Sequence, residues 1–253
     1  MRKGIPALLL TLSLLLCGCR LLPERIPPAG LTVHFLDVGQ ADCALLESGG
    51  EYMLIDGGNR EDGRLVVSYL EQQGVEELAY VVCTHAHEDH VGGLPSVLAV
   101  YPTHAVYAPT RTYASKVFDD FVYYADQQRL EITIPSPGDS WTLGETSVTI
   151  LGPVQSYADP NDTSIILRVE YGDTSFLFTG DMETSAENDM LDYWGSRMSW
   201  ETDVLKVGHH GSDTSTGYRF LNEVDPDYAV ISVGKGNAYG HPHDCLLYTS
   251  PSP

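Results

Sequence analysis

Four residues that could bind a metal ion lie close together near the middle of the first half of this chain. They are His85, His87, Asp89 and His90, directly after the apolar run 78–83. Imidazole nitrogens and carboxylate oxygens are the ligands that zinc and similar divalent ions prefer. A solvated histidine-rich loop, or core histidines satisfied by hydrogen bonds, would be the alternative. Four such groups on one strand-to-helix turn favour a metal site.

Further candidate ligands in the second half also follow apolar runs. They are Asp181, His209, His210 and His241, after the runs 175–178, 203–207 and 228–233. Asp181 stands beside Gly180 at an expected strand end, which suits a bridging ligand because two carboxylate oxygens can face two ions. This recurrence predicts a metal site at one edge of a β-sandwich.

Two aspartates in the first third, Asp37 and Asp56, also stand at the ends of expected strands. Active-site loops of layered α/β folds gather at strand ends. Either carboxylate could orient a metal-binding histidine from behind. Each could equally be a turn aspartate that bonds its own backbone.

The elements that must position these residues are read from hydrophobic periodicity and turn residues. We expect strands at 31–36, 43–47, 51–55, 78–83, 106–108, within 131–151, and at 165–170, 175–178, 203–207 and 228–233, with helices at 65–73, 94–100, 114–128 and around 185–193. Strands and helices in this order predict an α/β fold. The length of 253 residues allows one large domain.

The first thirty residues predict the cellular location of the protein. Arg2 and Lys3 precede the apolar run 7–16, which is too short for a permanent membrane-spanning helix and is typical of a secretory signal. The run ends in a segment similar to a bacterial lipobox, which predicts residues 1–18 as a lipoprotein signal peptide, lipidation at Cys19 and a tether at 19–30. A plain signal peptide cleaved nearby is the alternative.

The chain is strongly acidic. Loss of Arg2 and Lys3 with the signal would take the net charge from −21 to −23. Such a charge repels DNA unless a local basic patch or metal ions intervene, although it could also simply keep the surface solvated. Cys43 and Cys83 lie in strand-like runs, so we expect buried thiols and no disulfide framework.

Together these residues resemble the metallo-β-lactamase superfamily, whose ligand motif reads His-x-His-x-Asp-His. More narrowly, they resemble the metallo-β-lactamase domain of ComEC-type competence DNA-uptake proteins. The resemblance spans 33–243 and is carried by 35–40, 55–58, 85–90 with Gly92 and Gly93, 161–164, 178–181, 205–212 and 239–242.

The resemblance implies a four-layer αββα sandwich that binds two divalent ions, usually zinc, with manganese as the alternative. His85 and His87 would hold one ion, Asp89 and His90 the other, and Asp181 would bridge them. A third histidine of the first site has no counterpart here, and Asn161 stands nearest its place.

The last ligand of the second site is expected to be His209, with His241 as the alternative. His210 and whichever of the two is not a ligand would stabilise the reacting oxygen or protonate the leaving group. Asp89, His210 and His241 are therefore the candidate catalytic residues.

The segment 245–253 departs from the family pattern. It resembles translated adapter sequence joined to a gene fragment, so we expect a domain over 31–244 that lacks its native C-terminal helix and a non-native tail at 245–253.

The expected function is an extracytoplasmic, lipid-anchored metal-dependent hydrolase that acts on a phosphodiester. DNA is the substrate that the resemblance suggests, which would link the protein to competence. A small phosphodiester or a lipid or wall headgroup stays open, and β-lactam hydrolysis is less favoured because fold does not determine function. The alternative is a surface lipoprotein that binds during DNA uptake or envelope work with little catalysis.

Overall fold

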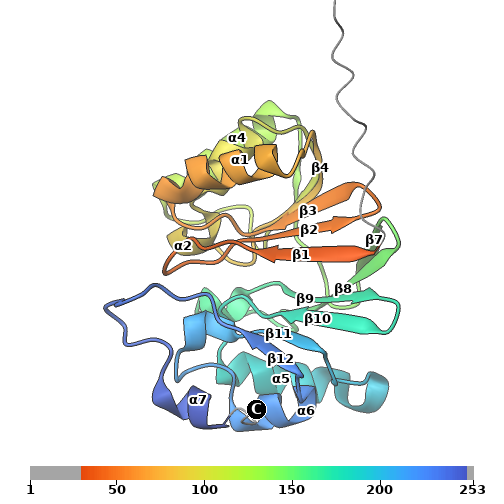
Figure 1. Cartoon of the computed structure of the whole chain (residues 1–253). Helices are drawn as coiled ribbons and strands as arrows, with labels where there is room; N and C mark the ends of the chain where they lie inside the picture. The colour runs from red at the N-terminus through yellow and green to blue at the C-terminus, as the bar shows by residue number, and fades with distance from the viewer. Residues whose placement is uncertain (1–29, 250–253) are drawn as a thin grey trace, which may run out of the picture.

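The computed structural model describes residues 30–249, which form four layers: helices, sheet, sheet and helices (Figure 1). The expected αββα sandwich is thereby confirmed. The expected signal peptide, Cys19 and all of the tether except Gly30 lie outside the described residues. In the described part of the chain, no helix is long and apolar enough to cross a membrane.

The first sheet has six strands in the order β1-β2-β3-β4-β5-β6. They are β1 (Leu31–Phe35), β2 (Ala44–Ser48), β3 (Glu51–Ile55), β4 (Leu78–Val82), β5 (Thr103–Tyr107) and β6 (Ile132–Thr133). The first three strands pair antiparallel, whereas β3 to β6 run parallel. Because parallel neighbours need a crossover, helices intervene between β3, β4, β5 and β6.

The second sheet repeats this plan with the order β12-β11-β10-β9-β8-β7. Its strands are β7 (Ser140–Leu143), β8 (Thr146–Gly152), β9 (Ile166–Tyr171), β10 (Thr174–Phe178), β11 (Val204–Lys206) and β12 (Tyr228–Val230). Strands β7 to β10 pair antiparallel, and β10, β11 and β12 run parallel. The parallel strands direct their C-terminal ends to the same edge of the sheet.

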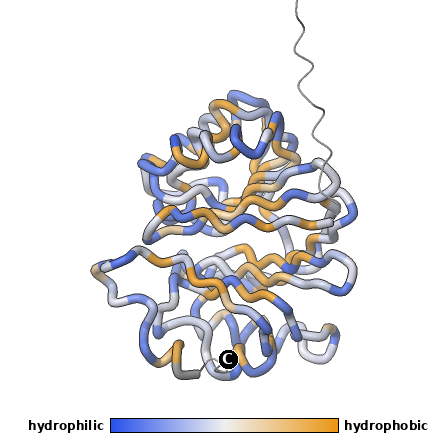
Figure 2. The backbone as a smooth tube through the Cα atoms, in the orientation of Figure 1, coloured by the Kyte–Doolittle hydropathy of each residue, from blue (hydrophilic) through white to orange (hydrophobic). Residues whose placement is uncertain are grey.

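The central strands are largely apolar along the two sheets, as the colours in Figure 2 show, and their side chains belong to cores on both faces. Leu46 and Met53 of the first sheet face Ile150 and Leu167 of the second in the core between the sheets. Alternate residues of the same strands, such as Leu45, turn to the helices outside. Burial on both faces explains why these strands have near-continuous apolar sequences.

Helices cover the outer face of each sheet (Figure 1). The first sheet is covered by α1 (Gly63–Gln72), α2 (Glu88–Val91), α3 (Leu94–Leu98) and α4 (Lys116–Gln127), and the second by α5 (Thr184–Trp194), α6 (Tyr218–Val224) and α7 (Asp244–Thr249). Phe118 and Phe121 of α4 are fully buried. Apolar side chains at helical spacing thus supply the two outer cores.

Most expected elements agree with the structure to within a few residues. Helix α6 was not expected, because seven residues are too few to show a clear helical period. The segment expected to be a non-native tail contains all of α7 except its first residue, Asp244, and Leu246 of this helix packs into the outer core of the second sheet. The origin of residues 245–253 and the expectation of a further native helix stay predictions.

Candidate metal centre

The candidate ligands meet where strands from both sheets end. His85 and His87 follow β4, Asp181 follows β10, and His209 and His210 follow β11. Asn161 lies in a short 3-10 helix, η2 (Asn161–Thr163), between β8 and β9. His241 lies beyond β12. The edge of the sandwich predicted from the sequence therefore carries all of them.

The turn that carries the histidine cluster is held tightly by the backbone. His87 is the N-cap of α2, and Asp89 and His90 lie in its first turn. The backbone carbonyl of His90 accepts from the Gly57 amide (2.8 Å), and that of Asp89 accepts from the Asp42 amide (3.1 Å). Two loops of the first sheet thus position the ligands.

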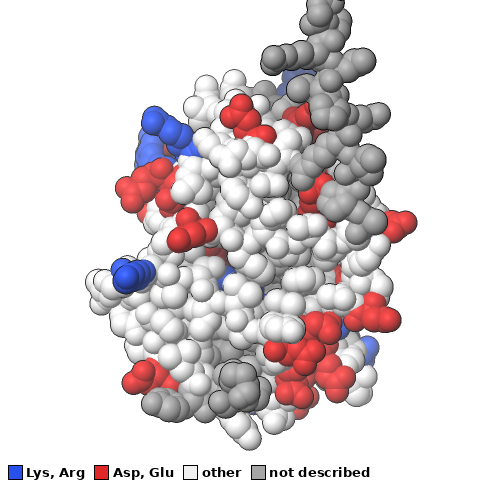
Figure 3. Space-filling model, in the orientation of Figure 1, with Lys and Arg blue, Asp and Glu red and all other residues white. Residues whose placement is uncertain are grey.

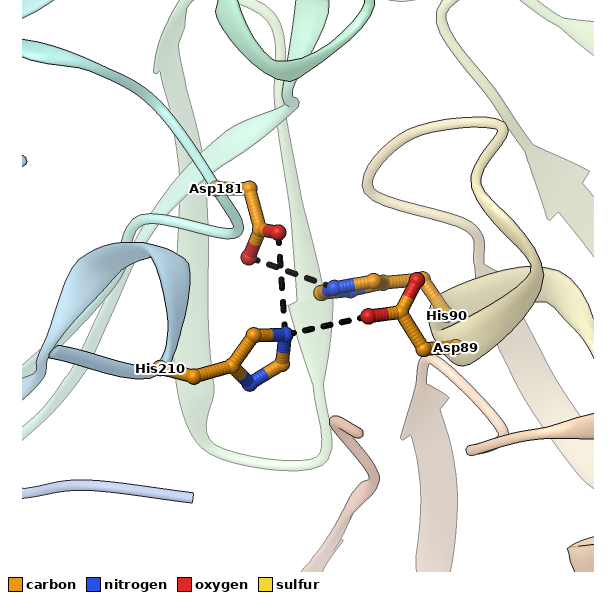
Figure 4. Close-up of side chains that lie close together, drawn as sticks. All are labelled: Asp89, His90, Asp181 and His210. Carbon is orange, nitrogen blue, oxygen red and sulfur yellow. Dashed lines mark hydrogen bonds and ion pairs between the residues drawn. The ribbon is translucent and has the colours of Figure 1, made fainter. Parts of the chain in front are cut away.

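Four side chains converge on one point (Figure 4). His90 Nε2 lies 3.2 Å from Asp181 Oδ1, and His210 Nε2 lies 3.6 Å from Asp181 Oδ2 and 3.2 Å from Asp89 Oδ2. Ligand atoms around a tetrahedral metal with bonds near 2.1 Å are about 3.4 Å apart. Asp89, His90, Asp181 and His210 therefore have the spacing of a metal-binding set.

A second set adjoins the first through Asp181. His85 Nε2 lies 3.1 Å from His87 Nδ1 and 3.8 Å from Asp181 Oδ2. Asp181 therefore has His85, His209 and His210 near Oδ2 and His90 near Oδ1. This arrangement suits a carboxylate shared between two ions.

Asn161 lines the same cleft as His87 and could add an oxygen to the set formed by His85 and His87. Its Nδ2 donates to Glu183 Oε1 (3.3 Å), whereas its Oδ1 is buried without a hydrogen-bond partner. The same Glu183 oxygen accepts from Thr214 Oγ1 (3.0 Å) and lies 3.4 Å from His209 Nδ1. Glu183 thus orients Asn161 and also contacts His209.

The two adjacent histidines differ from their expected places. We expected His209 to complete the second site and His210 to act on the substrate. It is His210, 2% exposed, that meets Asp89, His90 and Asp181, whereas His209 is partly exposed with Nε2 3.8 Å from Asp181 Oδ2. The reason is backbone conformation: both histidines have left-handed φ angles (46° and 53°), which periodicity does not reveal.

His241, the alternative last ligand, lies on the open side. Its ring is 5.8 Å from that of His209 and stacks on Tyr239 at 5.5 Å. It belongs to the wall of a cleft of about 320 Å³ that opens onto the site. The cleft is lined by Gln40, His87, Glu88, Asp89, Asn161, Asp181, His209, His210, Tyr239 and His241.

The two strand-end aspartates have different roles. Asp56 is buried; its Oδ2 lies 2.8 Å from His90 Nδ1, and it accepts from the amide and hydroxyl of Thr84 (both 2.7 Å). It can therefore orient His90, as expected. Asp37 does not reach the site: it is exposed and accepts from the Gly39 amide of its own turn (3.3 Å).

Electrostatically, the site attracts positive charge. Burial opposes protonation of His90, but the carboxylates of Asp181 and Asp56 outweigh burial and hold the pKa of His90 well above its usual value. For His210, burial is likewise outweighed by Asp181, Asp42 and Asp89, which raise its pKa to about 10. Buried carboxylates that stabilise imidazolium would also stabilise a divalent cation in place of the protons.

The donor set fits divalent metal ions. Among the described residues, the buried side-chain atoms without a hydrogen-bond partner include His90 Nε2, Asp181 Oδ1 and Asn161 Oδ1, which all belong to the candidate ligands. Unpartnered buried polar atoms are costly and need an explanation, such as an ion. Imidazole nitrogens with carboxylate and amide oxygens suit zinc, manganese or iron.

Two buried residues near the site were not expected from the sequence. Lys206 Nζ donates to Asp42 Oδ2 at 2.6 Å, and Asp42 Oδ1 lies 3.4 Å from His210 Nδ1. One signal could have revealed them: Lys206 is a lone cation in the apolar run 203–207, and a buried cation needs an anion.

Comparisons with known proteins agree with this geometry. The family model described as the metallo-beta-lactamase superfamily matches residues 36–235. Recombination protein 2 of Haemophilus influenzae is 33% identical over 241 residues, covering 92% of this chain and 28% of that protein. Competence protein ComA of Neisseria gonorrhoeae is 31% identical over 226 residues, covering 88% and 30%. ComE operon protein 3 of Bacillus subtilis is 29% identical over 235 residues, covering 85% and 30%.

The chain thus spans less than a third of the length of these curated relatives. Among solved structures, the metallo-beta-lactamase fold protein YhfI from Bacillus subtilis superposes with a TM-score of 0.57 at 15% identity, over 88% of this chain and 92% of that one. Such a likeness shows the fold. With the family model matching most of the sequence, the chain belongs to the metallo-beta-lactamase superfamily.

Proposed function

We propose that this protein is a hydrolase that binds two divalent metal ions and acts on phosphodiesters. The observation that carries the proposal is the position of Asp181 between two sets of ligands. His85, His87 and Asn161 would hold one ion, and Asp89, His90 and His210 the other. Zinc is the first candidate and manganese the second, since the amide oxygen of Asn161 beside His85 and His87 weakens the preference for zinc.

Bound ions would supply Lewis acidity and water of lowered pKa, and two ions a few ångströms apart suit in-line displacement at phosphorus. Around them, the residues of the chain hold the reacting groups. His209 and His241 line the cleft beside each other and can donate hydrogen bonds to substrate oxygens.

Gln40 determines which ring nitrogen of neutral His241 carries the hydrogen. Gln40 Oε1 accepts from the Gly234 amide (3.0 Å), which directs its Nε2 toward His241 Nδ1 (3.3 Å). An amide N–H beside Nδ1 makes Nδ1 the acceptor, so the neutral ring carries its proton on Nε2. The neutral ring of His241 could thus donate a hydrogen bond from Nε2 to a substrate oxygen.

DNA is the substrate that the relatives' names suggest, because they are a recombination protein and competence proteins. The charge of −21 argues against a broad DNA track, and Figure 3 shows acidic side chains outnumbering basic ones on the face it draws. We therefore propose that a short single-stranded end or a small phosphodiester enters the cleft.

The proposal is tested by metal analysis of the purified chain and by assays on a bis-aryl phosphodiester, linear DNA and a β-lactam. His87→Ala and Asp89→Ala should lower phosphodiester turnover at least about 100-fold. Matched controls are His104→Ala and Asp173→Ala, which remove the same side chains from exposed positions. Turnover retained in the first two variants would refute the mechanism.

A binding role with little catalysis is the second candidate, and the amide ligand Asn161 is the observation that favours it. Two bound ions without turnover on any of the three substrates, together with tight binding of DNA, would support it. Turnover that depends on His87 and Asp89 would refute it.

We further propose that the protein is anchored outside the cytoplasm through a lipid on Cys19. The support is the sequence alone: the basic start, the apolar run 7–16 and the lipobox-like segment. Expressed in a bacterial host, the chain should partition with membranes, and Cys19→Ser should release it. Equal partitioning of the two would contradict the anchor.

A further inference from the structure

Beneath the candidate metal centre lies a buried ion pair that joins the two sheets. Lys206 and Asp42 have side chains only 5% and 8% exposed, and Nζ and Oδ2 are 2.6 Å apart. Asp42 lies in the loop before β2 of the first sheet, and Lys206 ends β11 of the second. Burying two charges is costly, so a pair placed here calls for a role beyond stability.

The ion pair directly contacts His210. Asp42 Oδ1 lies 3.4 Å from His210 Nδ1, and the backbone carbonyl of Ser232 lies 3.0 Å from the same nitrogen. The hydrogen bond to the Ser232 carbonyl requires that Nδ1 carry a hydrogen, and the negative charge of Asp42 beside this nitrogen favours that hydrogen electrostatically. The neutral ring therefore directs the lone pair of Nε2 toward Asp89 and Asp181.

Lys206 explains how a further carboxylate, that of Asp42, can be buried beside the candidate metal centre. Asp42, Asp56 and His90 are close enough to one another to form a ligand set of their own. The ammonium group of Lys206 already occupies Asp42 Oδ2 and also donates to the Val207 carbonyl (2.9 Å). It balances one negative charge behind the site, so Asp42 serves His210 and not an additional ion.

We propose that Asp42, held by Lys206, is a positioning residue that places a negative charge against the Nδ1 side of His210 and so strengthens Nε2 as a ligand for the ion held with Asp89 and His90. The inference rests on the proposed function only in taking His210 as a ligand. A carboxylate behind a metal-binding histidine raises its basicity and fixes its orientation. Loss of such a partner weakens metal affinity by roughly 10–100-fold.

The first test is Asp42→Asn in the full chain, titrated with cobalt(II) and zinc(II) against a chelator. The amide removes the negative charge beside Nδ1 and nearly keeps the shape, so Nε2 of His210 becomes a weaker ligand. The expected result is a second ion bound roughly 10–100-fold more weakly, with an altered visible spectrum of the cobalt(II) form and an unchanged first equivalent. The matched control is Asp203→Asn, a carboxylate that accepts from Ser175 N and Oγ away from the site.

The inference is overturned if folded Asp42→Asn binds the second ion as tightly as the unaltered chain. If that variant does not fold, the same titration of Asp42→Glu decides, because this variant keeps the negative charge but changes its position. Affinity for the second ion equal to that of the unaltered chain would then overturn the inference. A chain that binds two ions but hydrolyses no phosphodiester would refute the hydrolase and leave this role of Asp42 intact. A chain that binds one ion would refute the two-ion proposal, and Asp42→Asn would then have to weaken that ion if His210 binds it.

Discussion

A buried glutamate gives the chain a pH dependence that can be calculated. Glu187 in α5 is 2% exposed, and its carboxylate accepts from the amides of Thr216 and Gly217. The amides of Thr216 and Gly217 lie at the end of the loop that carries His209 and His210. Burial raises the pKa of Glu187 from 4.5 to about 7, against the opposing effect of the two backbone donors.

The sign follows from proton binding. Between pH 4.5 and 7 the unfolded chain releases the Glu187 proton while the folded chain keeps it, so this group makes folding less favourable as pH rises. Below the lower pKa both states are protonated and the group contributes nothing. With these two values, the free energy of unfolding should lose about 2.5 kcal/mol between pH 5 and pH 8 from Glu187 alone.

Glu187→Gln removes the titration and retains the shape, so the difference between this variant and the unaltered chain isolates the group. Urea unfolding at several pH values, with chelator throughout, should show the variant gaining about 2.5 kcal/mol relative to the unaltered chain from pH 5 to pH 8. The control Glu223→Gln, exposed on α6, should show no such trend. A constant difference for Glu187→Gln, or one that falls with pH, would refute the reasoning.

Three further outcomes are expected. Asp181→Asn should reduce bound metal from two equivalents to one or fewer by metal analysis, since one charged oxygen pair serves both ligand sets; two retained equivalents would contradict a bridging role. Asn161→His should tighten zinc binding at the first site on the order of tenfold in chelator competition, because imidazole is the better zinc ligand; weaker binding would mean that this side chain does not face the ion. Gly93→Ala should lower the urea midpoint far more than Gly172→Ala. The Cβ at position 93 would lie 2.0 Å from the Gly57 carbonyl oxygen, whereas Gly172 has open space around it and only a left-handed φ of 59°. Equal shifts would show that the loops around Gly93 move to make room for the Cβ.

Strand ends were predictable because apolar runs and ligand types are both local features of the sequence. The run 78–83 predicted β4, and the histidines after it lie where a strand must end. In a layered fold, such ends gather at one edge, so the sequence predicted that Asp181 would meet the first cluster although 91 positions separate it from His90. The αββα architecture followed from the same pattern and from the resemblance.

Which of two adjacent residues meets the other ligands was not predictable, because it depends on backbone angles that a pattern of residue types does not contain. The exchange of His209 and His210 comes from two left-handed residues in succession. Asp42 and Lys206 were missed for a different reason: the partners are 164 positions apart and belong to different sheets. Only the lone lysine in an apolar strand indicated that a buried anionic partner exists.

The strain of the histidine turn shows how the site is prepared for its ligands. Left-handed φ costs about 1–2 kcal/mol for each non-glycine residue, and His209 and His210 both have it. Hydrogen bonds across the turn oppose this cost: Ser215 Oγ donates to the Gly208 carbonyl (2.8 Å), and the Gly208 amide donates to Thr216 Oγ1 (3.2 Å). Because these bonds involve no metal ligand side chain, the protein itself closes the turn. An arriving ion would therefore find Nε2 of His210 already directed at Asp89 and Asp181, and little of its binding energy would be needed to form the site.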